Sequence, residues 1–354
     1  MKIWKKLAAF FLLFSLSFVV AACGQTADTN DNDNEETQDA TDETVAEESN
    51  AEETTADGER EVLKFGTFAT TIQPILADQL GYFEEELADQ NVKIELETFD
   101  TGPAIKEALE AGELTFGSLG AQPTILANNN GTDLRIFGTY KTTEKSNALL
   151  ARKDAGINDL PDLKGKKIGY TAGSTLHNLL LKILDKAGLT ETDAELYPMD
   201  ASEIITSLQT GDIDAGMLWE PYITQALKNE DITEVVDGTG LVKEVCGYNA
   251  RKEFLDENPE IAGAVLQALD RAQQWSEENE AEAVANIAES SGSAEDEVQA
   301  IFDKCDGGSY ISQDKIDAIT DTADYLHGQG LIEQEYTGEE LVDTSVQESI
   351  GLKE

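Results

Sequence analysis

Apolar and polar residues alternate along the chain in two patterns, one typical of strands and one typical of helices. The helical pattern is clearest after Ser174 and Thr175, where apolar residues recur at the i, i+3, i+4 and i+7 positions of one helix face: Leu176, Leu179, Leu180, Ile183, Leu184 and Ala187. Ser174 and Thr175 are residue types that begin helices, and Gly188 is a residue type that ends them. The pattern therefore predicts a strand over 167–171, a break at 172–173 and a helix that ends at Gly188.

The turn between this strand and this helix is a candidate anion site. A Gly-Ser-Thr turn at a helix start leaves backbone N–H groups and hydroxyls at the positive end of the helix dipole, where small anions bind. An ordinary capped helix has the same spacing and is the alternative. His177 lies off the apolar face and within the first turn, and this position favours a binding site.

The same order of elements occurs earlier in the chain. The pattern predicts a strand over 62–68 and then a helix that begins at Thr70 and Thr71, carries Gln73 in its first turn and ends near Gly81. This unit has the plan of the strand and helix described above. We therefore interpret the two units as related parts of one architecture.

A second pair of segments is also similar. Residues 104–119 align with residues 203–218 without a gap, and in each a predicted helix ends at a glycine, Gly112 or Gly211, before a short strand. Two matches in the same order predict an α/β fold with two similar lobes. Chance similarity between generic strand–helix units is the alternative.

The rest of the chain completes this plan. Strands predicted over 148–153 and 246–251 join the lobes as crossing segments, and helices are predicted over 261–278, 281–290, 295–304 and 314–328, followed by an acidic tail on the surface. The predicted organisation is a signal peptide (1–22), a lipidated cysteine with a disordered acidic linker (23–60), the first part of lobe 1 (61–148), lobe 2 (149–245), and a return to lobe 1 with C-terminal helices (246–354).

The N-terminus has the pattern of an export signal. Lys2, Lys5 and Lys6 precede an apolar run over 7–20, which is too short to span a bilayer as a helix of the mature chain. The following Val-Ala-Ala-Cys segment, which ends at Cys23, resembles the lipobox of bacterial lipoproteins. The resemblance implies that Cys23 is diacylated, so we expect an extracytoplasmic protein anchored to the outer face of the cell membrane.

Acidic residues dominate the charge of the chain. There are 71 Asp and Glu against 25 Lys and Arg, which gives a formal net charge of −46. This charge argues against nucleic acid as a partner. Residues 25–60 form an acidic tract with few large apolar residues, for which we expect disorder. The acidic excess elsewhere suggests a bacterium from a saline or alkaline habitat, where salt screens the repulsion.

The sequence lacks the motifs of the common catalytic and metal sites. Its only histidines are His177 and His327, and it has no His-Glu-x-x-His, Cys-x-x-Cys or Gly-x-Ser-x-Gly motif and no phosphate-binding loop. We therefore expect that the protein is not an enzyme and that it uses no cofactor and no metal.

Two further pairs of residues are candidates for a structural or functional role. Cys246 and Cys305 would form a disulfide in an oxidising compartment, or would remain two separate buried thiols. Trp219 and Glu220 follow a predicted strand, and an exposed strand end is a place where ligands bind. Core packing of the indole is the alternative.

Several short motifs occur in a characteristic order. They are Thr101-Gly102-Pro103, the segments 148–153 and 162–168, the Gly173-Ser174 turn with His177-Asn178-Leu179-Leu180, and Leu218-Trp219-Glu220-Pro221-Tyr222. Together they resemble the solute-binding lipoproteins of ABC importers that handle aliphatic sulfonates, taurine and nitrate. The resemblance implies a type II periplasmic-binding-protein fold, in which the ligand lies in the cleft between two lobes.

The resemblance also implies which residues contact the ligand. The candidates are Thr70, Thr71, Gly120 and Gln122 from lobe 1, and Ser174, Thr175, His177, Trp219 and Glu220 from lobe 2. Where the family usually has Tyr-Gln after the first strand, this chain has Phe68-Ala69, and Gln73 is a further candidate. The contacts of the first lobe therefore depart from the family pattern.

The function implied by the resemblance is a monomeric, non-enzymatic receptor that delivers a small organic anion or zwitterion to an ABC permease and its ATPase. Because the Glu220 carboxylate would pair with an ammonium group, taurine-like aminosulfonates are favoured over plain alkanesulfonates. The alternatives are nitrate, or a pyrimidine or thiamine precursor or other heteroaromatic stacked on Trp219. A third alternative is an enzyme like some pyrimidine-synthesising relatives, and the lipobox argues against it.

Overall fold

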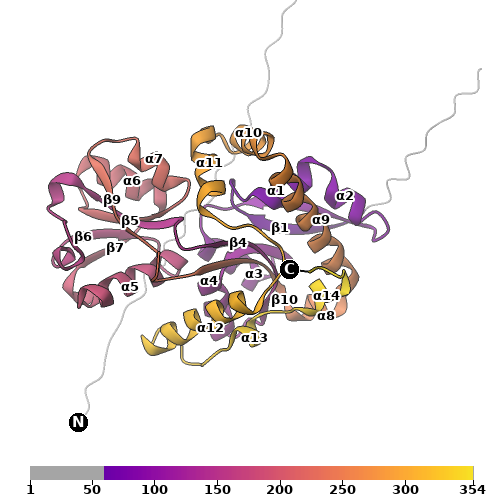
Figure 1. Cartoon of the computed structure of the whole chain (residues 1–354). Helices are drawn as coiled ribbons and strands as arrows, with labels where there is room; N and C mark the ends of the chain where they lie inside the picture. The colour runs from indigo at the N-terminus through magenta and orange to yellow at the C-terminus, as the bar shows by residue number, and fades with distance from the viewer. Residues whose placement is uncertain (1–59, 354) are drawn as a thin grey trace, which may run out of the picture. The chain divides into compact units, whose positions relative to one another are not determined.

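The computed structural model describes residues 60–353, so the predicted signal peptide, Cys23 and the linker up to residue 59 lie outside the described residues. The described strands form two five-stranded sheets, each with helices packed against it (Figure 1). The first sheet has the strand order β2 (Val92–Thr98), β1 (Glu61–Thr67), β3 (Phe116–Gly120), β10 (Glu244–Arg251), β4 (Leu134–Thr143). The second has the order β7 (Glu195–Pro198), β6 (Lys167–Tyr170), β8 (Ala215–Trp219), β5 (Asn147–Arg152), β9 (Ile232–Asp237).

The two sheets have the same topology. In the first sheet β1 pairs in parallel with β2 and β3, and β10 is antiparallel to both β3 and β4. In the second sheet β6 pairs in parallel with β7 and β8, and β5 is antiparallel to both β8 and β9. Strand β1 therefore corresponds to β6, β3 to β8, and β10 to β5. The predicted fold class, an α/β architecture with two similar lobes, is confirmed.

The chain passes between the sheets twice. It leaves the first sheet after β4 and enters the second as β5, and it leaves the second sheet after β9 and returns to the first as β10. The first crossing therefore ends in β5, which lies between β8 and β9, and the second ends in β10, which lies between β3 and β4. The strands predicted over 148–153 and 246–251 are confirmed.

The helices follow the predicted pattern. The first lobe contains α1 (Ile72–Gln79), α2 (Tyr82–Glu86), α3 (Gly102–Ala111) and α4 (Ala121–Asn129), and the second contains α5 (Thr175–Ala187), α6 (Ala201–Thr210) and α7 (Tyr222–Leu227). Short 3-10 turns lie at η1 (Lys153–Ala155), η2 (Leu160–Leu163) and η3 (Glu191–Asp193). Helix α5 begins after Ser174 and ends at Gly188, as the spacing of its apolar residues predicts.

The C-terminal part of the chain is helical. It contains α8 (Lys252–Glu257), α9 (Pro259–Glu278), α10 (Glu280–Ser291), α11 (Glu295–Lys304), α12 (Gln313–Gly328), α13 (Gly338–Leu341) and α14 (Ser345–Ser349). Figure 1 shows α9 and α10, in orange and brown, beside α1, and these helices are in contact. None of the helices in the described part is long and apolar enough to cross a bilayer.

The expectation of a surface tail after α12 is wrong in part. Leu341 and Val346 are buried, and α14 packs against α9 and β4. The reason is that the tail carries single apolar residues at helical spacing between its acidic residues, so one side of each short helix covers the core while the charged side faces solvent.

Helices pack onto strands in the same way in both lobes. Gly117 of β3 faces α3, and a Cβ atom there would lie 2.7 Å from Cγ2 of Ile105. Gly216 of β8 faces α6, and a Cβ atom there would clash with Cγ2 of Ile204. These are corresponding residues of the two aligned segments, 104–119 and 203–218. The internal repeat is therefore a repeat of three-dimensional packing.

Candidate functional site

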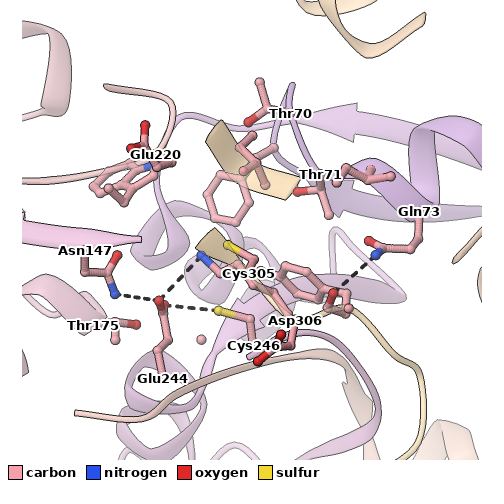
Figure 2. Close-up of a pocket in the computed structure, with 18 of the residues that line it drawn as sticks. Thr70, Thr71, Gln73, Asn147, Thr175, Glu220, Glu244, Cys246, Cys305 and Asp306 are labelled. Atoms are coloured by element: carbon pink, nitrogen blue, oxygen red, sulfur yellow. Dashed lines mark hydrogen bonds and ion pairs between the residues drawn. The ribbon is translucent and has the colours of Figure 1, made fainter. Parts of the chain in front are cut away.

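A cavity of about 470 Å³ is lined by residues from both sheets and from the C-terminal helices. Of the candidate residues, Thr70, Thr71, Gln73 and Gly120 line it from the first lobe, and Ser174, Thr175, Trp219 and Glu220 line it from the second. Figure 2 shows Thr71 and Gln73 on one side of this cavity and Thr175 on the other. The helix starts of α1 and α5, which correspond in the two lobes, thus meet at one cavity.

Two candidate residues, His177 and Gln122, are not among the residues that line the cavity. The His177 ring lies 4.9 Å from the Tyr170 ring, between centroids, and burial lowers the pKa of its imidazole against an opposing effect of Glu191. Gln122 is 1 % exposed, and its Oε1 atom has no partner among the described residues. Each of the two lies one or two positions after a residue that lines the cavity. Because a helix turns by about 100° per residue, its side chain points in another direction.

The start of α1 presents free donors to the cavity. Thr71 is the N-cap residue, but its side chain makes no capping hydrogen bond, and it lines the cavity (Figure 2). The N–H groups of the first turn have no partners within the helix, and Pro74 removes one of them without loss. The Gln73 side chain donates to the Tyr140 carbonyl oxygen at 3.2 Å, which holds this turn against the sheet.

The start of α5 is different, because its hydroxyls are already used. The Ser174 hydroxyl donates to the Thr171 carbonyl oxygen at 2.6 Å. The Thr175 hydroxyl bonds to the Glu244 carboxylate, and this bond helps to lower the pKa of Glu244. The prediction that both hydroxyls donate to an anion therefore requires them to exchange these bonds for bonds to the ligand. The sequence could not reveal this, because both partners depend on the fold of the turn and of the returning strand.

Glu244 is a buried carboxylate at the edge of the cavity. Its Oε2 atom accepts a hydrogen bond from Asn147 Nδ2 at 2.5 Å and lies 3.5 Å from Lys141 Nζ, and its Oε1 atom accepts from Cys246 Sγ at 3.1 Å (Figure 2). Burial alone would raise the pKa of Glu244, but the Lys141 ammonium and these donors together lower it. Glu244 is therefore an ionised group inside the protein.

Lys141 is the complementary partner in this pair. Burial alone would lower the pKa of its ammonium, but the Glu244 carboxylate raises it above the ordinary value. Asn147 and Glu244 are the first residues of β5 and β10, the two strands that complete the crossings. Sequence reasoning missed all three residues, although a charged or amide residue at the start of an otherwise apolar crossing strand was an available signal.

Glu220 does not have a free carboxylate. Its side chain is 1 % exposed and its Oε1 atom lies 2.6 Å from Lys304 Nζ at the end of α11. Its Oε2 atom accepts a hydrogen bond from the Thr224 backbone N–H at 3.1 Å. In this structure Lys304 of the C-terminal helices supplies the cation that pairs with Glu220, so a ligand ammonium would compete with Lys304 for this carboxylate. The Trp219 ring beside it lines the cavity and packs at 89° against Tyr222, with centroids 5.4 Å apart.

The C-terminal helices supply a wall that sequence reasoning did not assign to the site. Glu277, Glu280, Phe302 and Asp306 line the cavity from α9, α10, α11 and the residues after α11. Their amphipathic pattern indicates packing and carries no signal of a pocket. The wall brings both apolar surface and carboxylates to the cavity.

Of the two alternatives for Cys246 and Cys305, a disulfide or two separate thiols, the structure shows two free thiols, and both line the cavity. The Cys246 thiol instead donates to Glu244, and burial raises the pKa of both thiols. No group of three or more metal-ligating side chains is present among residues 60–353.

The model of the NMT1/THI5-like family matches residues 70–283, which is more than half of the chain. The chain belongs to the NMT1/THI5-like family. The chain is 30 % identical over 237 residues to a putative aliphatic sulfonates-binding protein of Escherichia coli, and the match covers 67 % of this chain and 74 % of that protein. The chain is also 26 % identical over 263 residues to the taurine-binding periplasmic protein of Escherichia coli, and this match covers 69 % of this chain and 80 % of that protein.

The NMT1/THI5-like chain is also similar to a solved structure. The periplasmic aliphatic sulphonate binding protein of Escherichia coli superposes with a TM-score of 0.70 at 26 % identity, covering 80 % of this chain and 97 % of that one. The resemblance inferred from the motifs, to binding proteins of the sulfonate and taurine group, is confirmed by these relatives. The two-lobed binding-protein fold is confirmed with it.

Proposed function

We propose that this protein is the extracytoplasmic substrate-binding lipoprotein of an ABC importer and that it captures a small sulfonate in the cavity between its two lobes. The observation that carries the proposal is the start of α1, where the N-cap residue Thr71 makes no capping hydrogen bond and lines the cavity. The relatives are named as binding proteins for aliphatic sulfonates or for taurine, and these names support the same ligand class.

The sulfonate group binds at the start of α1, with Thr70 and Thr71 as side-chain donors. Hydrogen bonds to a charged group contribute about 1.5–3 kcal/mol each, and the helix N-terminus adds about 0.3–1 kcal/mol. These donors contact the anion directly, whereas a charge on the outer surface acts through solvent and is screened by salt. Trp219 and Phe302 cover the apolar part of the ligand.

The protein acts by binding and release and not by catalysis. Closure of the two lobes around the ligand produces the form that the permease recognises. The ion pair between Glu220 of the second lobe and Lys304 of α11 supports such a closed form, because it joins the two sides of the cavity. The protein works as a monomer in this scheme, with a permease and an ATPase as its partners.

Calorimetry on the purified protein tests the ligand. We expect binding of taurine or ethanesulfonate and no binding of nitrate or of a pyrimidine. Tight binding of the pyrimidine alone would instead support a heteroaromatic ligand on Trp219, and binding of none of the four would contradict the proposed function.

Cys305 provides an independent readout at the cavity. Its thiol lines the cavity and its pKa is raised by burial, so alkylation is best followed above neutral pH. A bound sulfonate should slow the alkylation of the peptide that contains Cys305, as measured by mass spectrometry. Equal rates with and without ligand would place the ligand elsewhere.

The membrane anchor is the other part of the proposal. Cys23 lies outside the described residues, and its lipobox supports diacylation. Two acyl chains hold a protein stably at a membrane, whereas one does not. Expression of a Cys23→Ala variant in a bacterial host, followed by fractionation, should move the protein from the membrane to the soluble fraction.

A further inference from the structure

Glu244 lies where two helix starts converge. A Cβ atom added to Gly120, the N-cap residue of α4, would lie 2.5 Å from the Thr175 hydroxyl oxygen and 3.6 Å from Glu244 Oε1. Thr175 is the first residue of α5. The carboxylate thus sits beside the starts of both helices, at the place where an anion is favoured.

The carboxylate is held there by a built set of donors. Asn147, Cys246 and Thr175 bond to it, and Lys141 supplies the opposite charge. Glu244 is 6 % exposed, and these partners bond to both of its carboxylate oxygens. The end of the cavity that the sequence predicts to bind a ligand anion already contains an anion of the protein itself.

We propose that Glu244 is a specificity-determining residue. Its carboxylate excludes the ligand's sulfonate from the starts of α4 and α5. Together with the opposite charge of Lys141, it sets the ratio of the affinities for a plain sulfonate and for a zwitterionic aminosulfonate. This inference rests on the proposed function, since it concerns the same cavity. The sulfonate is directed to the start of α1, on the side of the cavity opposite Glu244 (Figure 2).

The balance between the two charges makes the inference testable. Lys141 and Glu244 both line the cavity, so either one, left without its partner, acts on a ligand at short range. Glu244→Gln keeps the shape and leaves the Lys141 ammonium unbalanced. Lys141→Met does the reverse and leaves the Glu244 carboxylate unbalanced. The two variants should therefore change anion affinity in opposite directions.

The experiment is calorimetry with two probes, ethanesulfonate and taurine, on the full-length protein and its variants. We expect Glu244→Gln to shift the ratio of the two affinities toward ethanesulfonate by about tenfold, and Lys141→Met to shift it toward taurine by a similar factor. The double variant should return to within about threefold of the wild-type ratio. Glu97→Gln is the matched control, because Glu97 pairs with Lys64 at 3.3 Å on an exposed surface outside the cavity, and it should change nothing.

The outcomes separate the two proposals. If the wild type binds neither probe, the proposed function fails and this inference fails with it. If the wild type binds but both variants weaken the two probes equally, the pair is only structural and the inference is overturned. A melting temperature for each variant shows whether it is folded. If one single variant does not fold, the other provides the test, because each is expected to shift the affinity ratio in a stated direction.

Discussion

The starts of α1 and α5 occupy corresponding places in the two lobes, and they present opposite chemistry to the cavity. At α1 the Thr71 side chain makes no capping bond and faces the cavity. At α5 the Ser174 hydroxyl is bonded to Thr171, and Thr175 is bonded to Glu244. A repeated topology therefore does not give a repeated site. The hydroxyls at the start of α5 bond to the protein's own groups, whereas the Thr71 hydroxyl at the start of α1 does not cap its helix.

The largest expected effect is the contrast between Thr71→Ala and Ser174→Ala. Loss of a hydroxyl that donates to an anion costs about 1.5–3 kcal/mol, so Thr71→Ala should weaken sulfonate binding about ten- to hundredfold. Ser174→Ala removes a bond to a backbone carbonyl oxygen and should change affinity by less than about threefold. Calorimetry with one sulfonate measures both. A larger loss in Ser174→Ala than in Thr71→Ala would reverse the assignment of the two helix starts.

The next effect concerns what the two lobes share. Gly117→Ala and Gly216→Ala each place a Cβ atom against the helix that packs on the strand, at Ile105 and Ile204 respectively. Overpacking of this kind costs about 1–3 kcal/mol, and we expect similar losses in the two lobes by denaturant unfolding. Gly328→Ala is the control, since a Cβ atom there meets nothing within 4 Å and should not destabilise. A loss of stability in only one of the two variants would show that the packing of helix on strand differs between the lobes.

The smallest expected effect is on the pH dependence of stability. His177 in the first turn of α5 can titrate, whereas Pro74, at the corresponding position of α1, cannot. Burial lowers the pKa of His177 in the folded protein. As pH falls through about 6.5, the unfolded chain takes up a proton that the folded chain resists, so the free energy of unfolding decreases. The loss between pH 7.5 and 5.5 should be smaller in His177→Phe than in wild type. An identical pH dependence in the two proteins would mean that His177 is not protected from protonation.

Much of the architecture could be predicted from the sequence, because it depends on local patterns. The apolar face of α5, the N-cap residues at Thr71 and Ser174, and the glycine at the end of α3 and of α6 are properties of short segments. The repeat of these segments predicted two lobes, and the helix starts placed Thr70, Thr71, Ser174 and Thr175 at one cavity.

Only the tertiary structure decided which of those residues are free. Glu244, Asn147 and Lys141 meet because two crossing strands and β4 come together, and their separation in the chain gives no spacing from which to predict the contact. Lys304 reaches Glu220 only because α11 packs beside the second lobe. Local sequence determines where donors and charges are placed on each element, whereas the hydrogen bonds and ion pairs that consume them are formed between elements, by the packing of the whole fold.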